Sequence, residues 1–140
     1  MPTAAPAQRQ APPDVADRPA ARARTDTRHS RRRAQADRAL LRAEYLDPHD
    51  RSLLVQVLGN GVPPADLSTV LGVSTRSVQR RVRRLMQRLN SRTTTILLRN
   101  QSRWHHGTAR VCMCVWVRGR TMRQAADETG MSLHEVRQHL

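Results

Sequence analysis

Hydrophobic positions recur at helical spacing along most of the chain, and three stretches predict helices. Residues 30–46 are rich in alanine, leucine and arginine, which favour a helix. A second helix is expected to start after Asp47, an N-cap residue followed by Pro48, and to stop at the Gly-Asn-Gly run of residues 59–61. The longest apolar stripe has spacings of four, three and four residues and consists of Val78, Val82, Leu85 and Leu89.

An internal repeat relates two parts of the sequence. Under a shift of 58 residues the identical pairs are Gly61 and Gly119, Gly72 and Gly130, Ser74 and Ser132, and Val78 and Val136. The conservative pairs are Leu53 and Val111, Val57 and Val115, Val73 and Met131, and Val82 and Leu140. Apolar positions and turn glycines coincide while most others differ, as expected of two copies that share a backbone but not a surface. Since neither copy needs a strand, the sequence predicts an all-α fold.

In the first copy, a short helix is expected to place Leu67 and Leu71 on its inner face. Gly72 then supplies the left-handed conformation that ends a helix at little cost. We expect Val73 to enter the core between two helices and Ser74 to cap the helix that follows. The pattern therefore predicts two helices joined by a tight turn.

The longer of these two helices has a basic side. At about 100 degrees per residue, the positions opposite or beside its apolar stripe are Arg76, Gln79, Arg80, Arg83, Arg84 and Gln87. Arginine pairs with guanine or phosphate, and glutamine pairs with adenine. A basic and amide face backed by an aliphatic stripe is typical of a helix that lies in the major groove of DNA. A solvated helix face, a nuclear-localisation signal and an RNA-binding run are the alternatives.

The second copy repeats this pattern with fewer charges. Two capping boxes are expected, Thr121 with Gln124 and Ser132 with Glu135. The predicted inner positions are Ala125, Thr129, Met131, Val136 and Leu140, and the predicted outward positions are His134, Arg137 and Gln138. Because this last helix has about two turns and carries Glu135, we expect a weaker reader of DNA or a scaffold.

These stretches resemble a known family. Residues 66–89, DLSTVLGVSTRSVQRRVRRLMQRL, are similar to the helix-turn-helix of bacterial sigma-factor region four, and residues 121–140, TMRQAADETGMSLHEVRQHL, resemble the same pattern. The shared features are an apolar pair, the Leu-Gly-Val-Ser run, and a valine four residues after the serine, followed by arginine and an apolar residue. A sigma factor also needs a promoter-melting domain with a set of exposed aromatic residues, and this chain has only three aromatic residues. The resemblance therefore applies to DNA binding alone.

The resemblance implies two tandem helix-turn-helix units of three to four helices, residues 30–92 and 93–140. In the first unit, the residues expected to contact duplex DNA in the major groove are Ser74, Thr75, Arg76, Ser77, Gln79, Arg80 and Arg83, with Arg84 at the edge. In the second unit, the corresponding residues are Ser132, His134, Arg137 and Gln138. Whether RNA polymerase or another protein is a further partner stays open.

Charge and composition agree with a polyanionic partner. The formal net charge is +14 and all 25 basic residues are arginine. Residues 47–100 hold nine arginines against three acidic residues, so the basic excess is greatest around the first copy. Residues 1–29, rich in Pro, Ala and Arg, are predicted to form a disordered basic arm that tethers phosphates or enters the minor groove. With only Tyr45, Trp104 and Trp116 as aromatics, stacking on single strands is not expected, and the tryptophans are predicted to pack inside.

Other chemistry finds little support. Cys112 and Cys114, near His105 and His106, are two residues apart on a predicted helix, which directs their thiols about 200 degrees apart, a poor chelate. We expect one of these cysteines in the core, the other on the surface, and no bound metal. No catalytic constellation or phosphate-loop motif stands out, so neither an enzyme nor a cofactor is expected. Without an apolar run of ~20 residues or a signal-peptide core, the expected location is cytoplasmic, on the nucleoid.

The leading interpretation is a sequence-specific binder of double-stranded DNA that regulates transcription. One alternative is the end-binding part of a transposase or recombinase system, which also uses paired helix-turn-helix units. Another is a phage packaging or partition adaptor that binds DNA and docks a protein through its second unit.

Overall fold

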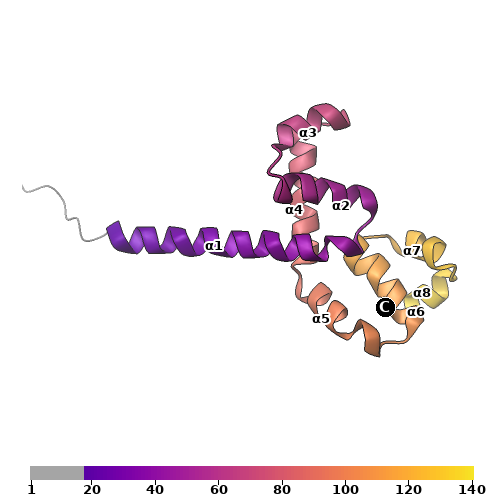
Figure 1. Cartoon of the computed structure of the whole chain (residues 1–140). Coiled ribbons are helices and arrows are strands. Elements are labelled where there is room, and N and C mark those ends of the chain that lie inside the picture. Colours follow the sequence, from indigo (N-terminus) through magenta and orange to yellow (C-terminus); the bar gives the residue numbers. More distant parts are fainter. Residues whose placement is uncertain (1–17) are drawn as a thin grey trace, which may run out of the picture. The chain divides into compact units, whose positions relative to one another are not determined.

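The computed structural model describes the backbone of residues 18–140 and the side chains of residues 27–140, and this described part is helical throughout (Figure 1). The α-helices are α1 (Arg18–Arg42), α2 (Pro48–Leu54), α3 (Pro64–Leu71), α4 (Thr75–Leu89), α5 (Arg92–Asn100), α6 (His106–Cys112), α7 (Met122–Thr129) and α8 (Leu133–Gln138). Two 3₁₀ turns, η2 (Ala43–Tyr45) and η4 (Gln101–Arg103), and two π-helical turns, η3 (Val55–Gly59) and η5 (Met113–Arg118), lie between them. Among the described residues no helix has the length and apolar character needed to cross a membrane.

The chain divides into two units between residues 32 and 33. Helix α1 runs from the first unit into the second, and it begins at Arg18 rather than at residue 30. The predicted disordered arm, residues 1–29, is therefore corrected for residues 18–29, which are helical. Its remaining part, residues 1–17, lies outside the described residues.

The sequence repeat is present in the bounds of the helices. A shift of 58 residues carries α2 onto α6, α3 onto α7, and the first residue of α4 onto the first residue of α8. The same shift carries the last residue of α1 onto the last residue of α5, the turn η2 onto η4, and the start of η3 onto the start of η5. The repeat is thus longer than the sequence suggested, since it includes α5, which the apolar pattern did not predict.

Backbone hydrogen bonds follow the same register. Val62 N donates to Gln56 O at 2.9 Å, and Arg120 N donates to Cys114 O at 2.9 Å, one bond in each copy. Each bond spans six residues, and its donor lies just beyond a π-helical turn, at the same place in both copies. After these turns come Gly61 and Gly119, with φ of 69° and 71°, a left-handed conformation that favours glycine.

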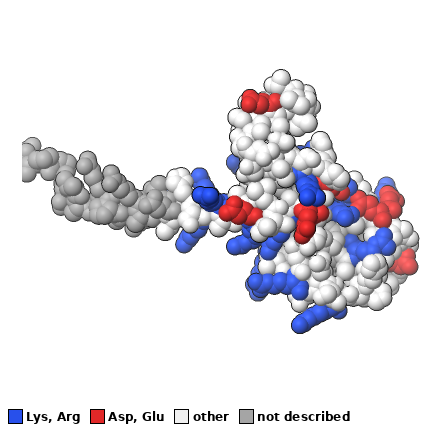
Figure 2. All heavy atoms as spheres, viewed as in Figure 1, with Lys and Arg blue, Asp and Glu red and all other residues white. Residues whose placement is uncertain are grey.

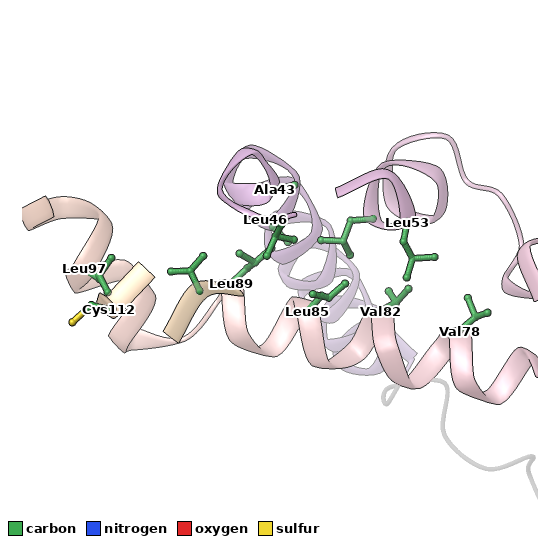
Figure 3. Close-up of a cluster of buried hydrophobic side chains, with 12 residues drawn as sticks. Ala43, Leu46, Leu53, Val78, Val82, Leu85, Leu89, Leu97 and Cys112 are labelled. Carbon is green, nitrogen blue, oxygen red and sulfur yellow. The ribbon is translucent and has the colours of Figure 1, made fainter. Parts of the chain in front are cut away.

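The main hydrophobic core extends over both copies. Leu54 and Leu89 are fully buried at 0 % exposure, and they belong to one cluster with Leu97, Cys112 and Val117 from the second copy. Figure 3 shows Val78, Val82, Leu85 and Leu89 along one side of α4, facing this core, which confirms the predicted stripe. A smaller cluster belongs to the second copy alone and consists of Val111, Cys114, Ala125 and Val136.

Four predicted packing positions are wrong. Leu71 and Val73, expected on the inner side of α3 and its turn, are 40 % and 47 % exposed, and α3 buries none of its residues. Cavities of about 200 Å³ and 110 Å³ remain beside them, with Leu53 of α2 among their linings. Leu140 is 44 % exposed because α8 ends at Gln138. Trp116, expected inside, is 47 % exposed.

The two cysteines also differ from expectation, because both are buried. The two side chains belong to different core clusters, so neither lies on the surface. Cys112 packs in the shared cluster and Cys114 packs in the cluster of the second copy. Both thiols are free.

Candidate nucleic-acid interface

Helix α4 is held at its start and along one side. Ser74 caps it, because its side-chain oxygen accepts a hydrogen bond from Ser77 N at 3.2 Å. Four apolar side chains on the helix are buried, as described above, so the opposite side must face outward. Fifteen residues make α4 about 22 Å long, which is ample for a groove about 12 Å wide.

The outward side of α4 is rich in hydrogen-bond donors. Its exposed polar and basic side chains are Arg76, Gln79, Arg80, Arg83, Arg84 and Gln87. Within residues 27–140, none of these six side chains makes a hydrogen bond or an ion pair to another protein group. The predicted contact arginines are therefore gathered on one helix face and free to meet an external partner.

Two further arginines of α4 have structural roles. Arg81 pairs with Asp50 of α2, with 2.6 Å between its Nη2 and the carboxylate Oδ1. Arg88 donates from Nη1 to the carbonyl oxygen of Arg118 at 2.9 Å, which ties α4 to the second copy. The sequence prediction omitted both residues from the contact set. At about 100 degrees per residue, neither residue lies on the outward face of α4.

The hydroxyl groups predicted to contact DNA already have partners. Ser74 Oγ lies 2.8 Å from Ser77 Oγ, and Thr75 Oγ1 lies 3.0 Å from Ser68 Oγ of α3. Hydroxyl groups donate and accept at once, so these side chains keep the capacity for a further hydrogen bond. Ser74 and Ser77 close the start of α4, and Thr75 ties that start to α3.

The second copy presents a shorter outward face. Helix α8 has six residues, and Ser132 and Glu135 form the predicted capping box at its start. The hydrogen bonds from Ser132 hold the pKa of Glu135 below its usual range. His134, Arg137 and Gln138 are exposed, with 3.1 Å between Gln138 Nε2 and His134 Nε2.

A hollow of about 420 Å³ borders the outward side of α4, and sequence reasoning missed it. Its polar lining comes from Gln79, Arg83 and Gln87 of α4, from Asn90, and from Gln35 near the end of α1. No local pattern could reveal it, because it depends on how α1 crosses α4. The end of α1 is therefore a neighbour of the candidate interface.

A metal centre finds no support in the arrangement of ligands. Within the described part of the chain, no group of three or more His, Cys, Asp or Glu side chains could hold an ion. Burial raises the pKa of Cys112 and of Cys114, and Cys114 Sγ also donates to Glu128 Oε2 at 3.3 Å, which raises the pKa of that thiol further. Protonated, separated thiols are poor metal ligands.

The chain matches no protein-family model, no curated protein and no solved structure. The resemblance to sigma-factor region four stays a prediction that depends on the residues quoted for it.

Proposed function

We propose that the chain is a sequence-specific binder of double-stranded DNA, built from two tandem helix-turn-helix units, that regulates transcription. Helices α3 and α4 are the pair of the first unit, with α4 in the major groove, and α7 and α8 are the pair of the second. A nucleoid location follows from this proposal. The predicted unit boundaries, residues 30–92 and 93–140, belong to the same proposal.

One observation carries the proposal. The outward side of α4 holds four exposed arginines without an acidic partner among residues 27–140, and the opposite side is fixed by four buried apolar side chains. An unpaired row of guanidinium groups on a rigid helix is suited to phosphates and to guanine edges. Gln79 and Gln87 beside them add amide groups of the kind that read adenine.

The first experiment is a selection of random duplex DNA with the full-length chain at near-physiological salt. A recovered motif with two unlike half-sites supports reading by both units. A single short half-site supports reading by the first unit and removes that role from α8. Salt-sensitive binding without any enriched sequence contradicts the proposal of a sequence-specific regulator.

Variants then test the assignment of α4. Gln79→Ala and Arg80→Ala are each expected to weaken binding to the selected site by about 1–3 kcal/mol and to relax discrimination at particular bases. Arg123→Ala is the matched control, because Arg123 is an exposed arginine of α7, away from α4 in the sequence. Equal losses on all sequences would restrict Gln79 and Arg80 to phosphate contacts.

A further inference from the structure

Helix α4 turns into α5 at a corner that is fastened to the end of α1. Asn90 Nδ2 donates to the backbone oxygen of Gln35 at 3.1 Å, and Arg42 donates from Nη1 to Leu89 O. Thr94 Oγ1 closes the corner from the other side, because it donates to Arg88 O at 2.8 Å. The first two bonds fix the corner against the last two turns of α1, and the third holds α4 and α5 together.

Three arginines belong to the helices at this corner, two to α1 and one to α5. Arg38 lies three residues after Gln35 and four before Arg42, so all three share one face of α1. Arg99 comes from α5, whose Leu97 packs in the same cluster as Ala39 of α1. Burial, followed by the positive charges of Arg38 and Arg99, lowers the pKa of Arg42, as expected of guanidinium groups held close together.

The positive charge at the corner is not balanced within the described part of the chain. None of the three arginines forms an ion pair there. Figure 2 shows blue side chains gathered over the region where Figure 1 places α5, with no acidic side chain among them. Arg42 is half-buried and fixed to a carbonyl, whereas Arg38 and Arg99 are exposed and free to turn toward a ligand. Guanidinium donors without acidic partners suit a phosphate group.

We propose that Arg38, Arg42 and Arg99 bind a backbone phosphate of the duplex on which α4 lies, outside the bases that α4 reads. This inference rests on the proposed function. A free phosphate offers the same chemistry, but continuity with the α4 face favours DNA. The hollow of about 420 Å³ has Arg83 and Gln87 of α4 along its lining together with Gln35 and Asn90 at the corner. A strand that leaves the α4 face along this hollow reaches the corner, where Arg42 is bonded to Leu89 O.

The test uses the full-length chain with Arg38→Ala and Arg99→Ala combined, leaving Arg42 and its bond to Leu89 O intact. We expect weaker binding of about equal size on all sequences, and a slope of log affinity against log salt that is smaller by about 0.9, the value for one phosphate. The matched control combines Arg103→Ala with Arg123→Ala, two exposed arginines outside the corner. A control with the same slope change as the corner variant would overturn the proposal.

Duplexes with single methylphosphonate links locate the phosphate. One flanking position is expected to weaken binding of the natural chain and to have no further effect on the corner variant, since the charge pair is then already lost. Unchanged sensitivity at every flanking position in the corner variant overturns the inference. Circular dichroism of each variant shows that the fold is kept.

Two further measurements distinguish failure of the phosphate site from failure of the proposed function. If Gln79→Ala weakens binding and the corner variant does not, the proposed function stands and the phosphate site falls. If neither variant affects binding, both proposals fall. Inorganic phosphate at constant ionic strength provides the last arm. A rise in the melting temperature of the natural chain, absent in the corner variant, combined with unchanged DNA binding, would assign the site to a free anion and overturn the DNA assignment.

Discussion

In the first copy of the repeat α4 buries Val78, Val82, Leu85 and Leu89, whereas its counterpart α8 buries only Val136. The middle helices show the reverse, because α3 buries no residue and α7 buries Ala125 and Thr129. The two copies, in which α2 and α3 have the same bounds as α6 and α7 under the shift, thus bury side chains on different helices. The first copy anchors α4, the helix with the basic face. The second copy instead anchors α7, the helix that precedes α8.

One position of the repeat shows how this difference arises. Glu128 of α7 bonds to Arg120 and lies 3.5 Å from Arg118, so α7 is tied to the segment before it. The equivalent residue in α3 is Val70, which is 81 % exposed. A valine there offers no ionic partner, and α3 is left with its contacts to α4 and its turn. The comparison indicates that a few substitutions decide whether the middle helix closes onto the one before it.

The largest effect is expected in the core that the two copies share. Leu89 is fully buried in it, so Leu89→Ala should lower the free energy of unfolding by about 2–5 kcal/mol. Both tryptophans belong to the second copy, and their fluorescence should change together with the loss of helix in urea. Leu41→Ala, at a side chain 77 % exposed, is the control and should stay within about 0.5 kcal/mol. Two separate transitions in the natural chain would show that the copies unfold independently.

A smaller contrast is expected between the glycines Gly61 and Gly119, which are equivalent in the repeat. Alanine at either position must adopt a positive φ, which costs about 1–2 kcal/mol. At Gly61 the new Cβ would meet open space, whereas at Gly119 it would clash with the guanidinium of Arg88. Gly119→Ala should therefore cost about 1 kcal/mol more, since Arg88 must give up its bond to Arg118 O. Equal losses in urea unfolding would contradict the tie between the copies.

The smallest effect concerns Glu128 and its pH dependence. Burial acts to raise the pKa of Glu128, but hydrogen bonds from Cys114 and Arg120 and the charges of Arg120 and Arg118 outweigh it, so the pKa lies below the ordinary 4.5. A lowered pKa stabilises the fold above that ordinary value, and the stabilisation is lost as the pH falls through the folded pKa. Glu128→Gln should therefore cost about 1 kcal/mol at neutral pH and less in acid.

Glutamine at the equivalent position of the first copy, Val70, provides the comparison for Glu128→Gln. Val70→Gln is expected to change the free energy of unfolding by less than about 0.5 kcal/mol at any pH, because Val70 is exposed and has no ionic partner to lose. Urea unfolding at a series of pH values measures both variants. A Glu128→Gln loss that does not depend on pH would show that packing, not charge, holds α7.

Local patterns predicted the elements whose burial is dictated by their own sequence. The stripe of α4 is long and regular, and the capping boxes of α7 and α8 are short-range features, so all three could be read directly. Helix α5 is not predicted, because its sequence, RTTTILLRN, is rich in β-branched residues, which disfavour a helix. The equivalent part of α1 is rich in alanine and arginine, so the two segments show no similarity in sequence. The repeat was therefore recognised only where both copies keep apolar residues.

Positions that depend on contacts between helices were not predictable. Leu71 and Val73 have the spacing of inner residues, yet whether they are covered depends on how α3 packs on α2. The basic face of α4 could be listed from helical geometry, and its side chains are exposed as expected. The corner arginines could not, because Arg99 comes from a helix that the sequence did not reveal and lies far along the chain from Arg38.

The burial of two thiols in two different clusters gives the chain a pair of built-in chemical reporters. Cys112 is covered by the shared core and Cys114 by the core of the second copy, and burial raises the pKa of both. Because each cysteine is almost fully covered, opening of its own cluster speeds its reaction with a thiol reagent. Mass spectrometry of the unaltered chain gives the two modification rates separately. Faster modification of Cys114 than of Cys112 would show that the cluster of the second copy opens while the shared core stays closed.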